Sequence, residues 1–164
     1  MNNDILYSPW RIDYILSNKD KKCIFCNKPK KNNDEENLIL FRSKTCFVIM
    51  NRYPYNNGHL LIVPFRHVSK LNDLNSEEIS DLFGTVQLCE KVIEEIYHCD
   101  GINMGMNLGK AAGAGIDDHL HVHLLPRWNG DSNFMTTIGA TRVLPESFES
   151  SYKKLKQAFD KEEI

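Results

Sequence analysis

Three histidines alternate with apolar residues in the segment DHLHVHLLP at residues 118–126. Side chains that alternate with period two point to opposite faces of a β-strand, so this segment predicts a strand with one histidine face and one apolar face. His119, His121 and His123 would then follow one another at roughly 7 Å along that face, too far apart for all three to hold one metal ion easily. Burying three imidazoles is costly unless each has a hydrogen-bond partner or a ligand. The pattern therefore indicates a site where each histidine does different work along an elongated substrate.

The other apolar patterns predict an α+β domain. Four more strands are expected at residues 38–41, 45–50, 59–64 and 101–108. The longest helical pattern runs from about Ser76 to Cys99, where Asn75 can act as the cap and Glu78 as its reciprocal partner. The apolar stripe expected to face the core consists of Ile79, Leu82, Phe83, Val86, Cys89, Ile93 and Ile96. Shorter helices are expected at residues 4–18 and 146–161. We therefore expect an antiparallel sheet of about five strands with one long helix and peripheral N- and C-terminal helices.

Length and charge narrow the class of protein. A chain of 164 residues fits one domain, with an N-terminal arm at 1–37 and a C-terminal helix within 145–164. A net charge of −2 argues against a protein that binds nucleic acid mainly by electrostatics. No apolar run approaches the roughly 20 residues of a membrane helix, and the N-terminus does not read as a signal peptide. We expect a cytoplasmic protein with neither nucleic acid nor membrane as a partner.

Two of the five cysteines have the spacing of metal ligands. An odd number of cysteines argues against a disulfide framework. Cys23 and Cys26 are separated by two residues, as zinc ligands often are, but one such pair supplies only half of a tetrahedral site. We expect His67 and His119 to complete it. A redox-active dithiol is the alternative, and it is less favoured because no βαβ pattern surrounds the pair.

A run of small residues precedes the histidine strand. Residues 107–115 read NLGKAAGAG, and without bulky side chains their backbone N–H groups can approach an anion closely. An ordinary turn is the alternative interpretation, but the position beside three histidines favours contact with phosphate. Asn107, Ala114 and Gly115 are the candidate phosphate-binding residues.

These segments resemble a known family. HLHVHLL at 119–125 resembles the signature of the histidine triad (HIT) superfamily of nucleotidyl hydrolases and transferases, and GHLLIVP at 58–64 resembles a second block of that family. YSPWR at 7–11, the cysteine pair, and PRWNGDSNFM at 126–135 followed by Ile138 and Gly139 resemble the bacterial diadenosine tetraphosphate phosphorylase branch. The resemblance covers about residues 7–145.

The resemblance implies covalent catalysis on a nucleotide. His121 would attack the α-phosphorus and carry the nucleotidyl group, and His123 would contact the phosphate oxygens. His59 would support the triad from the neighbouring strand.

The resemblance also implies residues that bind rather than react. His119 would serve zinc, while Asn51 and Trp128 would contact the base or ribose of the nucleotide. For Trp128, a place over the core is the alternative. The family further implies a homodimer.

One position departs from the family pattern. Many relatives have a serine four residues before the first triad histidine, where this chain has Gly115. The missing hydroxyl matters little for a polyphosphate leaving group, which is already acidic, but a leaving amine needs a proton.

The glycine therefore favours dinucleoside polyphosphates as substrates. We expect diadenosine tetraphosphate to be cleaved by inorganic phosphate to ADP and ATP. Hydrolysis by water and cleavage of nucleoside phosphoramidates are the enzymatic alternatives. A zinc-stabilised nucleotide-binding module without turnover is the non-enzymatic one.

Overall fold

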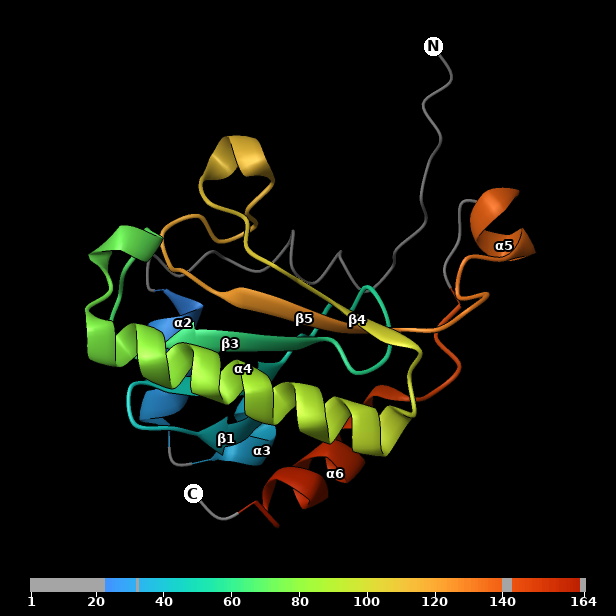
Figure 1. Ribbon diagram of the computed structural model, residues 1–164, viewed down its shortest axis with the longest axis horizontal. Coiled ribbons are helices and arrows are strands. Elements are labelled where there is room, and N and C mark those ends of the chain that lie inside the picture. The colour runs from blue at the N-terminus through green and yellow to red at the C-terminus, as the bar shows by residue number, and fades with distance from the viewer. Residues whose placement is uncertain (1–22, 32, 140–142, 163–164) are drawn as a thin grey trace.

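A single antiparallel sheet forms the centre of the computed structural model, which describes residues 23–31, 33–139 and 143–162. Its strands are β1 (Ile39–Arg42), β2 (Cys46–Met50), β3 (Leu60–Pro64), β4 (Gly101–Gly105) and β5 (Val122–Arg127). The spatial order is β1-β2-β3-β5-β4, and every neighbouring pair is antiparallel (Figure 1). The last strand in sequence is thus inserted between β3 and β4, which places the histidine segment inside the sheet rather than at its edge.

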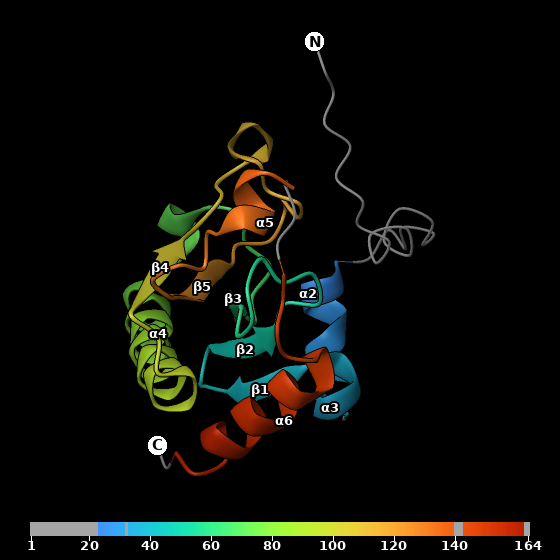
Figure 2. The same ribbon diagram turned by 90° about the vertical axis from the view of Figure 1, so that its right-hand side faces the viewer.

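Helices lie on both sides of this sheet. The long α4 (Ser76–Tyr97) crosses one face, and the single turn α2 (Ile24–Asn27) lies on the opposite side (Figure 2). Helix α6 (Phe148–Phe159) packs beside β1 and α4. The remaining elements are α3 (Asp34–Asn37), α5 (Phe134–Thr137) and the 3-10 turns η1 (Lys28–Lys30), η2 (Leu71–Asp73) and η3 (Lys110–Ala112). The predicted α+β architecture is confirmed, while the helix expected at 4–18 lies outside the described residues.

The start of α4 follows the sequence closely. The Asn75 side chain accepts a hydrogen bond from the Glu78 backbone N–H at 2.9 Å, and the Glu78 carboxylate accepts one from the Asn75 N–H at 2.9 Å. The predicted capping box is confirmed. Arg66 adds two hydrogen bonds of 2.7 Å to the same carboxylate, which holds the pKa of Glu78 down at about 2.

The predicted core stripe of α4 is partly wrong. Leu82, Val86, Cys89 and Ile93 are buried, but Ile79 is 38% exposed and Phe83 is 41% exposed. These two side chains lie at the flank of the buried face of the helix, and Thr85 and Val92 are buried on that face instead.

The limits of two strands also differ from expectation by more than one residue. The strand predicted at 101–108 ends at Gly105. The histidine strand begins at Val122, so His119 and His121 lie in the segment just before it. Their alternation is nevertheless continued within β5, where Val122, Leu124 and Pro126 are buried and the residues between them are half-buried. No helix in the described part of the chain combines the length and the apolar character that crossing a membrane requires.

Candidate active site

Two neighbouring strands bring histidines from distant parts of the chain together. His123 in β5 lies opposite Leu61 of β3 and Gly105 of β4, and His59 directly precedes β3. The Nε2 atom of His59 is 2.9 Å from Nδ1 of His123. The His121 and His123 ring centroids are 4.9 Å apart. The three candidate catalytic histidines therefore form one cluster.

The hydrogen bonds around His59 determine where its proton lies. The Asn51 side-chain oxygen accepts from the Tyr53 N–H at 3.0 Å, so its NH₂ group faces His59 Nδ1 at 3.1 Å. The Tyr55 backbone N–H also donates to His59 Nδ1, at 3.2 Å. Because Nδ1 accepts, the proton of neutral His59 is on Nε2 and is donated to His123 Nδ1.

This orientation leaves one buried donor without a partner. Since His123 accepts at Nδ1, its own proton is on Nε2. That Nε2 atom is buried and has no hydrogen-bond partner within the described residues. A buried N–H without an acceptor costs roughly 1–3 kcal/mol, so the site favours a ligand that brings an oxygen to this atom.

His121 is held in the form that a nucleophile requires. Its Nδ1–H donates to the backbone carbonyl of His119 at 2.8 Å, which leaves the lone pair on Nε2. Burial lowers the pKa of His121, although the bond to the His119 carbonyl opposes this shift. Burial, reinforced by the neighbouring imidazoles, lowers the pKa of His59 to about 3, and that of His123 to about 4. All three rings are therefore uncharged at neutral pH.

A second cluster consists of Cys23, Cys26, His67 and His119. Their candidate ligand atoms all lie within 4.8 Å of one another. Nδ1 of His119 is 3.2 Å from the Cys23 sulfur and 3.6 Å from the Cys26 sulfur, which in turn is 3.3 Å from Nδ1 of His67. Tetrahedral zinc with these ligands has edges of roughly 3.4–3.8 Å. The four predicted ligands thus meet in an arrangement that could hold a metal ion.

The surroundings of His119 support that arrangement. Its Nε2–H donates to the Pro64 carbonyl at 2.9 Å, which leaves Nδ1 free to bind a cation. Burial raises the pKa of Cys23 to about 11, so in the absence of a cation this thiol is protonated at neutral pH. Binding of a metal would release that proton, because the thiolate is the ligand.

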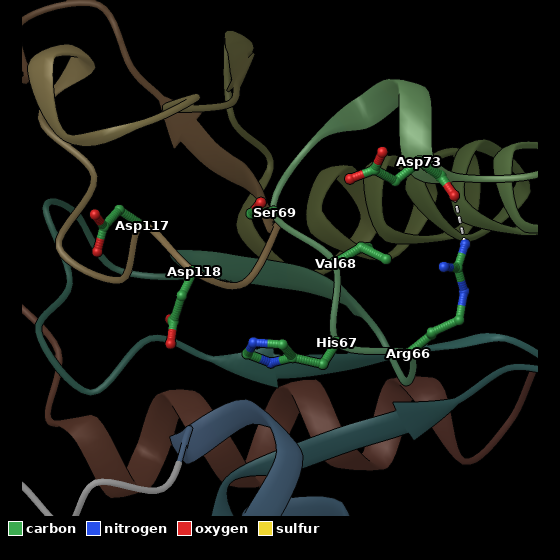
Figure 3. Close-up of a pocket in the computed structure, with 7 residues that line it drawn as sticks. All are labelled: Arg66, His67, Val68, Ser69, Asp73, Asp117 and Asp118. Carbon is green, nitrogen blue, oxygen red and sulfur yellow. Dashed lines mark hydrogen bonds between the residues drawn. The ribbon is translucent and has the colours of Figure 1, made fainter.

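A cavity of about 740 Å³ opens beside this cluster (Figure 3). Arg66 lies at one end, where it donates to the Asp73 carbonyl at 2.5 Å, and the acidic pair Asp117 and Asp118 lies at the other. His67 lies between them and is exposed. The metal-ligand cluster is therefore reached by solvent from the His67 side.

The predicted phosphate-binding residues lie next to the histidine cluster in the chain. β4 pairs Gly105 with His123, and Asn107 follows two residues after the end of β4. The loop then forms η3, flanked by two glycines with positive φ, Gly109 (φ 86°) and the left-handed Gly113 (φ 85°). Ala114 is half-buried and Gly115 is exposed, just before the histidine segment.

Trp128 is the predicted site residue that does not join the cluster. It follows β5, whereas His121 precedes it, so roughly 20 Å of extended chain separates them. The indole N–H donates to the Tyr97 carbonyl at 3.3 Å, and the two rings pack edge to face with centroids 6.0 Å apart.

Two aromatic residues that the sequence did not single out complete the site. They belong to a continuous row of rings whose neighbouring centroids are between 4.9 and 5.5 Å apart: Tyr55, His59, His123, His121, Phe25, His119 and His67. Tyr55 is 58% exposed at one end of this row, while Phe25 is 2% exposed in its middle. The only sequence signal for Phe25 is its position between the two cysteines.

Gly58 is expected to be irreplaceable beside His59. Its φ is +75°, and a Cβ there would lie 2.6 Å from the Tyr97 ring and 3.1 Å from the Pro126 ring. We expect Gly58→Ala to lower the free energy of unfolding by about 2 kcal/mol or more, measured by urea denaturation. Gly84→Ala in α4, where a Cβ would have no neighbour within 4 Å, is the control and should not destabilise. A Gly58 variant as stable as the wild type would contradict this account of the loop.

Acid is expected to destabilise the protein through the same histidines. Their folded pKa values, about 3 for His59 and about 4 for His123, lie below the 6.5 of the unfolded chain. The unfolded chain therefore binds more protons below pH 6.5, and stability falls by up to about 1.4 kcal/mol per pH unit for each histidine as the pH drops toward 4. Urea unfolding between pH 8 and 5 measures this slope. His59→Gln should flatten it, and equal slopes for the variant and the wild type would contradict the assignment.

Comparison with known proteins agrees with this geometry. The family model described as the HIT domain matches residues 32–130. An AP-4-A phosphorylase of Mycobacterium tuberculosis is 39% identical over 150 residues, which cover 86% of this chain and 76% of the relative. An asymmetrical bis(5'-nucleosyl)-tetraphosphatase of Schizosaccharomyces pombe is 36% identical over 93 residues, covering 57% of this chain and 50% of that protein.

Solved structures share the fold. A zinc-bound histidine triad family protein from Mycobacterium smegmatis superposes with a TM-score of 0.62 at 29% identity, over 75% of this chain and 84% of that one. A histidine triad nucleotide-binding protein from Sulfolobus tokodaii gives a TM-score of 0.65 at 25% identity, over 84% and 92%. The sheet order, the histidine cluster and these matches together show that the chain belongs to the HIT domain family.

Proposed function

We propose that this protein is an enzyme that cleaves dinucleoside polyphosphates, with diadenosine tetraphosphate and inorganic phosphate converted to ADP and ATP. The observation that carries the proposal is the pairing of two neighbouring imidazoles. His121 has a free lone pair on Nε2, and His123 offers an unpartnered N–H beside it. The names of the relatives from Mycobacterium and Schizosaccharomyces support the substrate class.

The reaction proceeds in two displacements. The Nε2 lone pair of His121 attacks the α-phosphorus, a P–N bond forms, and the P–O bond to the rest of the chain breaks with release of ATP. The His123 N–H donates to an oxygen of the reacting phosphoryl group and stabilises its charge in the transition state. An oxygen of inorganic phosphate then attacks the same phosphorus, the P–N bond breaks, and ADP leaves.

His59 contributes by orienting His123. The chain of bonds from Asn51 through His59 places the proton of His123 on the nitrogen that would face the phosphate. The residue at 115 supplies no hydroxyl, but ATP as a leaving group needs little protonation. The lack of a hydroxyl at position 115 therefore favours polyphosphates over phosphoramidates as substrates.

The remaining substrate contacts are assigned by position. Asn107, Ala114 and Gly115 bind the phosphate chain through the amide of Asn107 and backbone N–H groups. The NH₂ group of Asn51 already donates one hydrogen bond to His59. Asn51 therefore contacts the ribose only through its remaining hydrogen-bonding positions. Contact between Trp128 and a nucleotide requires either an extended dinucleotide or a second protomer, because the indole lies at the far end of β5.

We further propose that the metal is zinc, since two sulfur and two imidazole ligands suit it. A role in structure rather than chemistry follows from the full set of four protein ligands. The described cysteines are unpaired, which agrees with a cytoplasmic location. We also propose that the chain is a single domain, with an N-terminal arm at 1–37 and its last helix within 145–164.

A homodimer through β4 completes the proposal. β4 ends the sheet order, so one of its edges has no neighbouring strand among the described residues. Met104 in this strand is 54% exposed, and Leu108 shortly after it is 50% exposed. An apolar sheet edge favours pairing with a second copy. Light scattering on the purified protein tests this assembly.

Product analysis tests the reaction. The full chain is incubated with diadenosine tetraphosphate with and without inorganic phosphate, and the nucleotides are separated by chromatography. We expect ADP and ATP in equal amounts only when phosphate is present. AMP and ATP irrespective of phosphate would make the protein a hydrolase, and turnover of a nucleoside phosphoramidate alone would move it to that class. Binding of AMP with no turnover of any of these substrates would support a binding module instead.

A further inference from the structure

Phe25 joins the metal-ligand cluster to the nucleophile. It lies in α2 between Cys23 and Cys26 and is 2% exposed. Its ring centroid is 5.5 Å from that of His119 at an interplanar angle of 79°, and 5.2 Å from that of His121 at 49°. The neighbouring Ile24, in the same turn, is 46% exposed. One side chain of this turn therefore contacts both a metal-ligand candidate and the nucleophile.

The His121 ring needs such a neighbour. The hydrogen bond from its Nδ1 to the His119 carbonyl leaves the ring able to tilt about that contact. His123 packs against it at 4.9 Å and Phe25 at 5.2 Å. A nucleophile displaced by about 1 Å can lose roughly 100-fold in rate, so the contact that limits this tilt matters for turnover.

The turn that carries Phe25 depends on its cysteines. α2 has only four residues, and a single helical turn is not stable by itself. Both cysteine sulfurs lie within 3.6 Å of His119 Nδ1, so a shared cation would tie the turn to the histidine segment. Without that tie, the turn would keep the burial of Phe25, the packing of Cys23 against the core and the hydrogen bond from Lys28 Nζ to the Asn37 carbonyl.

We propose that Phe25 is a positioning residue that couples metal binding to the placement of the His121 imidazole. The metal then controls the rate of nucleotide transfer as well as the stability of the fold. This coupling rests on the proposed function for its kinetic consequence, but not for its effect on the ring itself.

The test compares Phe25→Leu with Ile24→Leu, which alters the exposed neighbour in the same turn. We expect Phe25→Leu to keep the wild-type metal stoichiometry and a KM for diadenosine tetraphosphate within about twofold, while kcat falls by about 10- to 100-fold. Ile24→Leu should leave all three unchanged. Nitrogen NMR of the His121 ring gives a readout that needs no substrate. Phe25→Leu should broaden or shift its signals, and metal removal from the wild type should do the same.

Several results would overturn the coupling. An unchanged kcat and an unchanged His121 spectrum in Phe25→Leu would show that Phe25 only fills space. A raised KM at constant kcat would show that it contacts the nucleotide instead. If Phe25→Leu does not fold, Phe25→Met, whose unbranched and flexible side chain adapts to an irregular gap, provides the same comparison. A wild type without turnover would refute the proposed function, whereas the NMR comparison would still decide the role of Phe25.

Discussion

Replacement of His121 by alanine is expected to lower the turnover of diadenosine tetraphosphate by at least about 10⁴-fold, because removal of a covalent nucleophile leaves only binding and charge stabilisation. The substitution removes the nitrogen that would bond to phosphorus. It should spare the backbone carbonyl of His119, which belongs to the main chain. We therefore expect AMP to bind the variant, with only turnover lost.

A covalent intermediate gives an independent readout. Wild-type protein mixed with diadenosine tetraphosphate in the absence of phosphate should gain the mass of one adenylyl group, and His121→Ala should not. His98→Asn is the matched control, since His98 caps α4 with φ 45°, a conformation that asparagine tolerates, and takes no part in the histidine cluster. Turnover within tenfold of wild type in His121→Ala would show that another group is the nucleophile.

Loss of the metal is the second large effect that we expect. Cys23→Ser should abolish stoichiometric zinc binding and lower the thermal midpoint by about 10 °C or more. A structural metal site contributes several kcal/mol to the free energy of unfolding, and each kcal/mol changes the thermal midpoint by roughly 2–4 °C for a chain of this size. The physical reason is that the candidate ligands come from the start of α2, the segment after β3 and the histidine segment, so a bound ion would tie three distant parts of the chain together.

Metal analysis and thermal denaturation check this expectation together. Cys99→Ser is the control, because Cys99 is half-buried and does not belong to the metal-ligand cluster. It should retain zinc and unfold near the wild-type temperature. Unchanged zinc content in Cys23→Ser would remove that sulfur from the site, and a lost ion without a change in midpoint would show that the metal does not support the fold.

Local patterns were enough to predict most of the architecture. Apolar runs located β2 and β3, alternating side chains located β5, and the Asn75 and Glu78 pair located the start of α4 to the residue. These features depend on neighbours a few positions apart, which a sequence displays directly. The order of the strands was not predicted, since the pairing of β5 with β3 joins segments about sixty residues apart.

Other features depend on tertiary contacts and escaped prediction. Ile79 and Phe83 fit the apolar period of α4, but the buried face of the helix includes Thr85 and Val92 and leaves these two side chains exposed on its flank. The ring that Trp128 packs against, Tyr97 at the end of α4, was also not predicted, while its expected contact with a nucleotide stays a prediction.

The candidate site shows the same division. The chemistry and spacing of the histidines and cysteines identify them as candidate site residues in the sequence, whereas no sequence pattern identifies Phe25 and Tyr55. Asn51 was expected to contact the nucleotide, and the structure shows it oriented by Tyr53 toward His59. The direction of the hydrogen bonds from Asn51 through His59 to His123 depends on backbone N–H groups such as that of Tyr55. The sequence does not give the positions of these groups, because they depend on the conformation of the loop.

The two roles of His119 have an evolutionary consequence. Its ring belongs to the metal-ligand cluster, but the oxygen that orients His121 comes from the backbone and would persist with any side chain at that position. The four ligands could accordingly be exchanged for well-packed apolar side chains, provided that the replacement core still presses an aromatic ring against the nucleophile. A chain redesigned in this way would not need zinc for its activity. It should therefore retain its turnover in the presence of strong chelators.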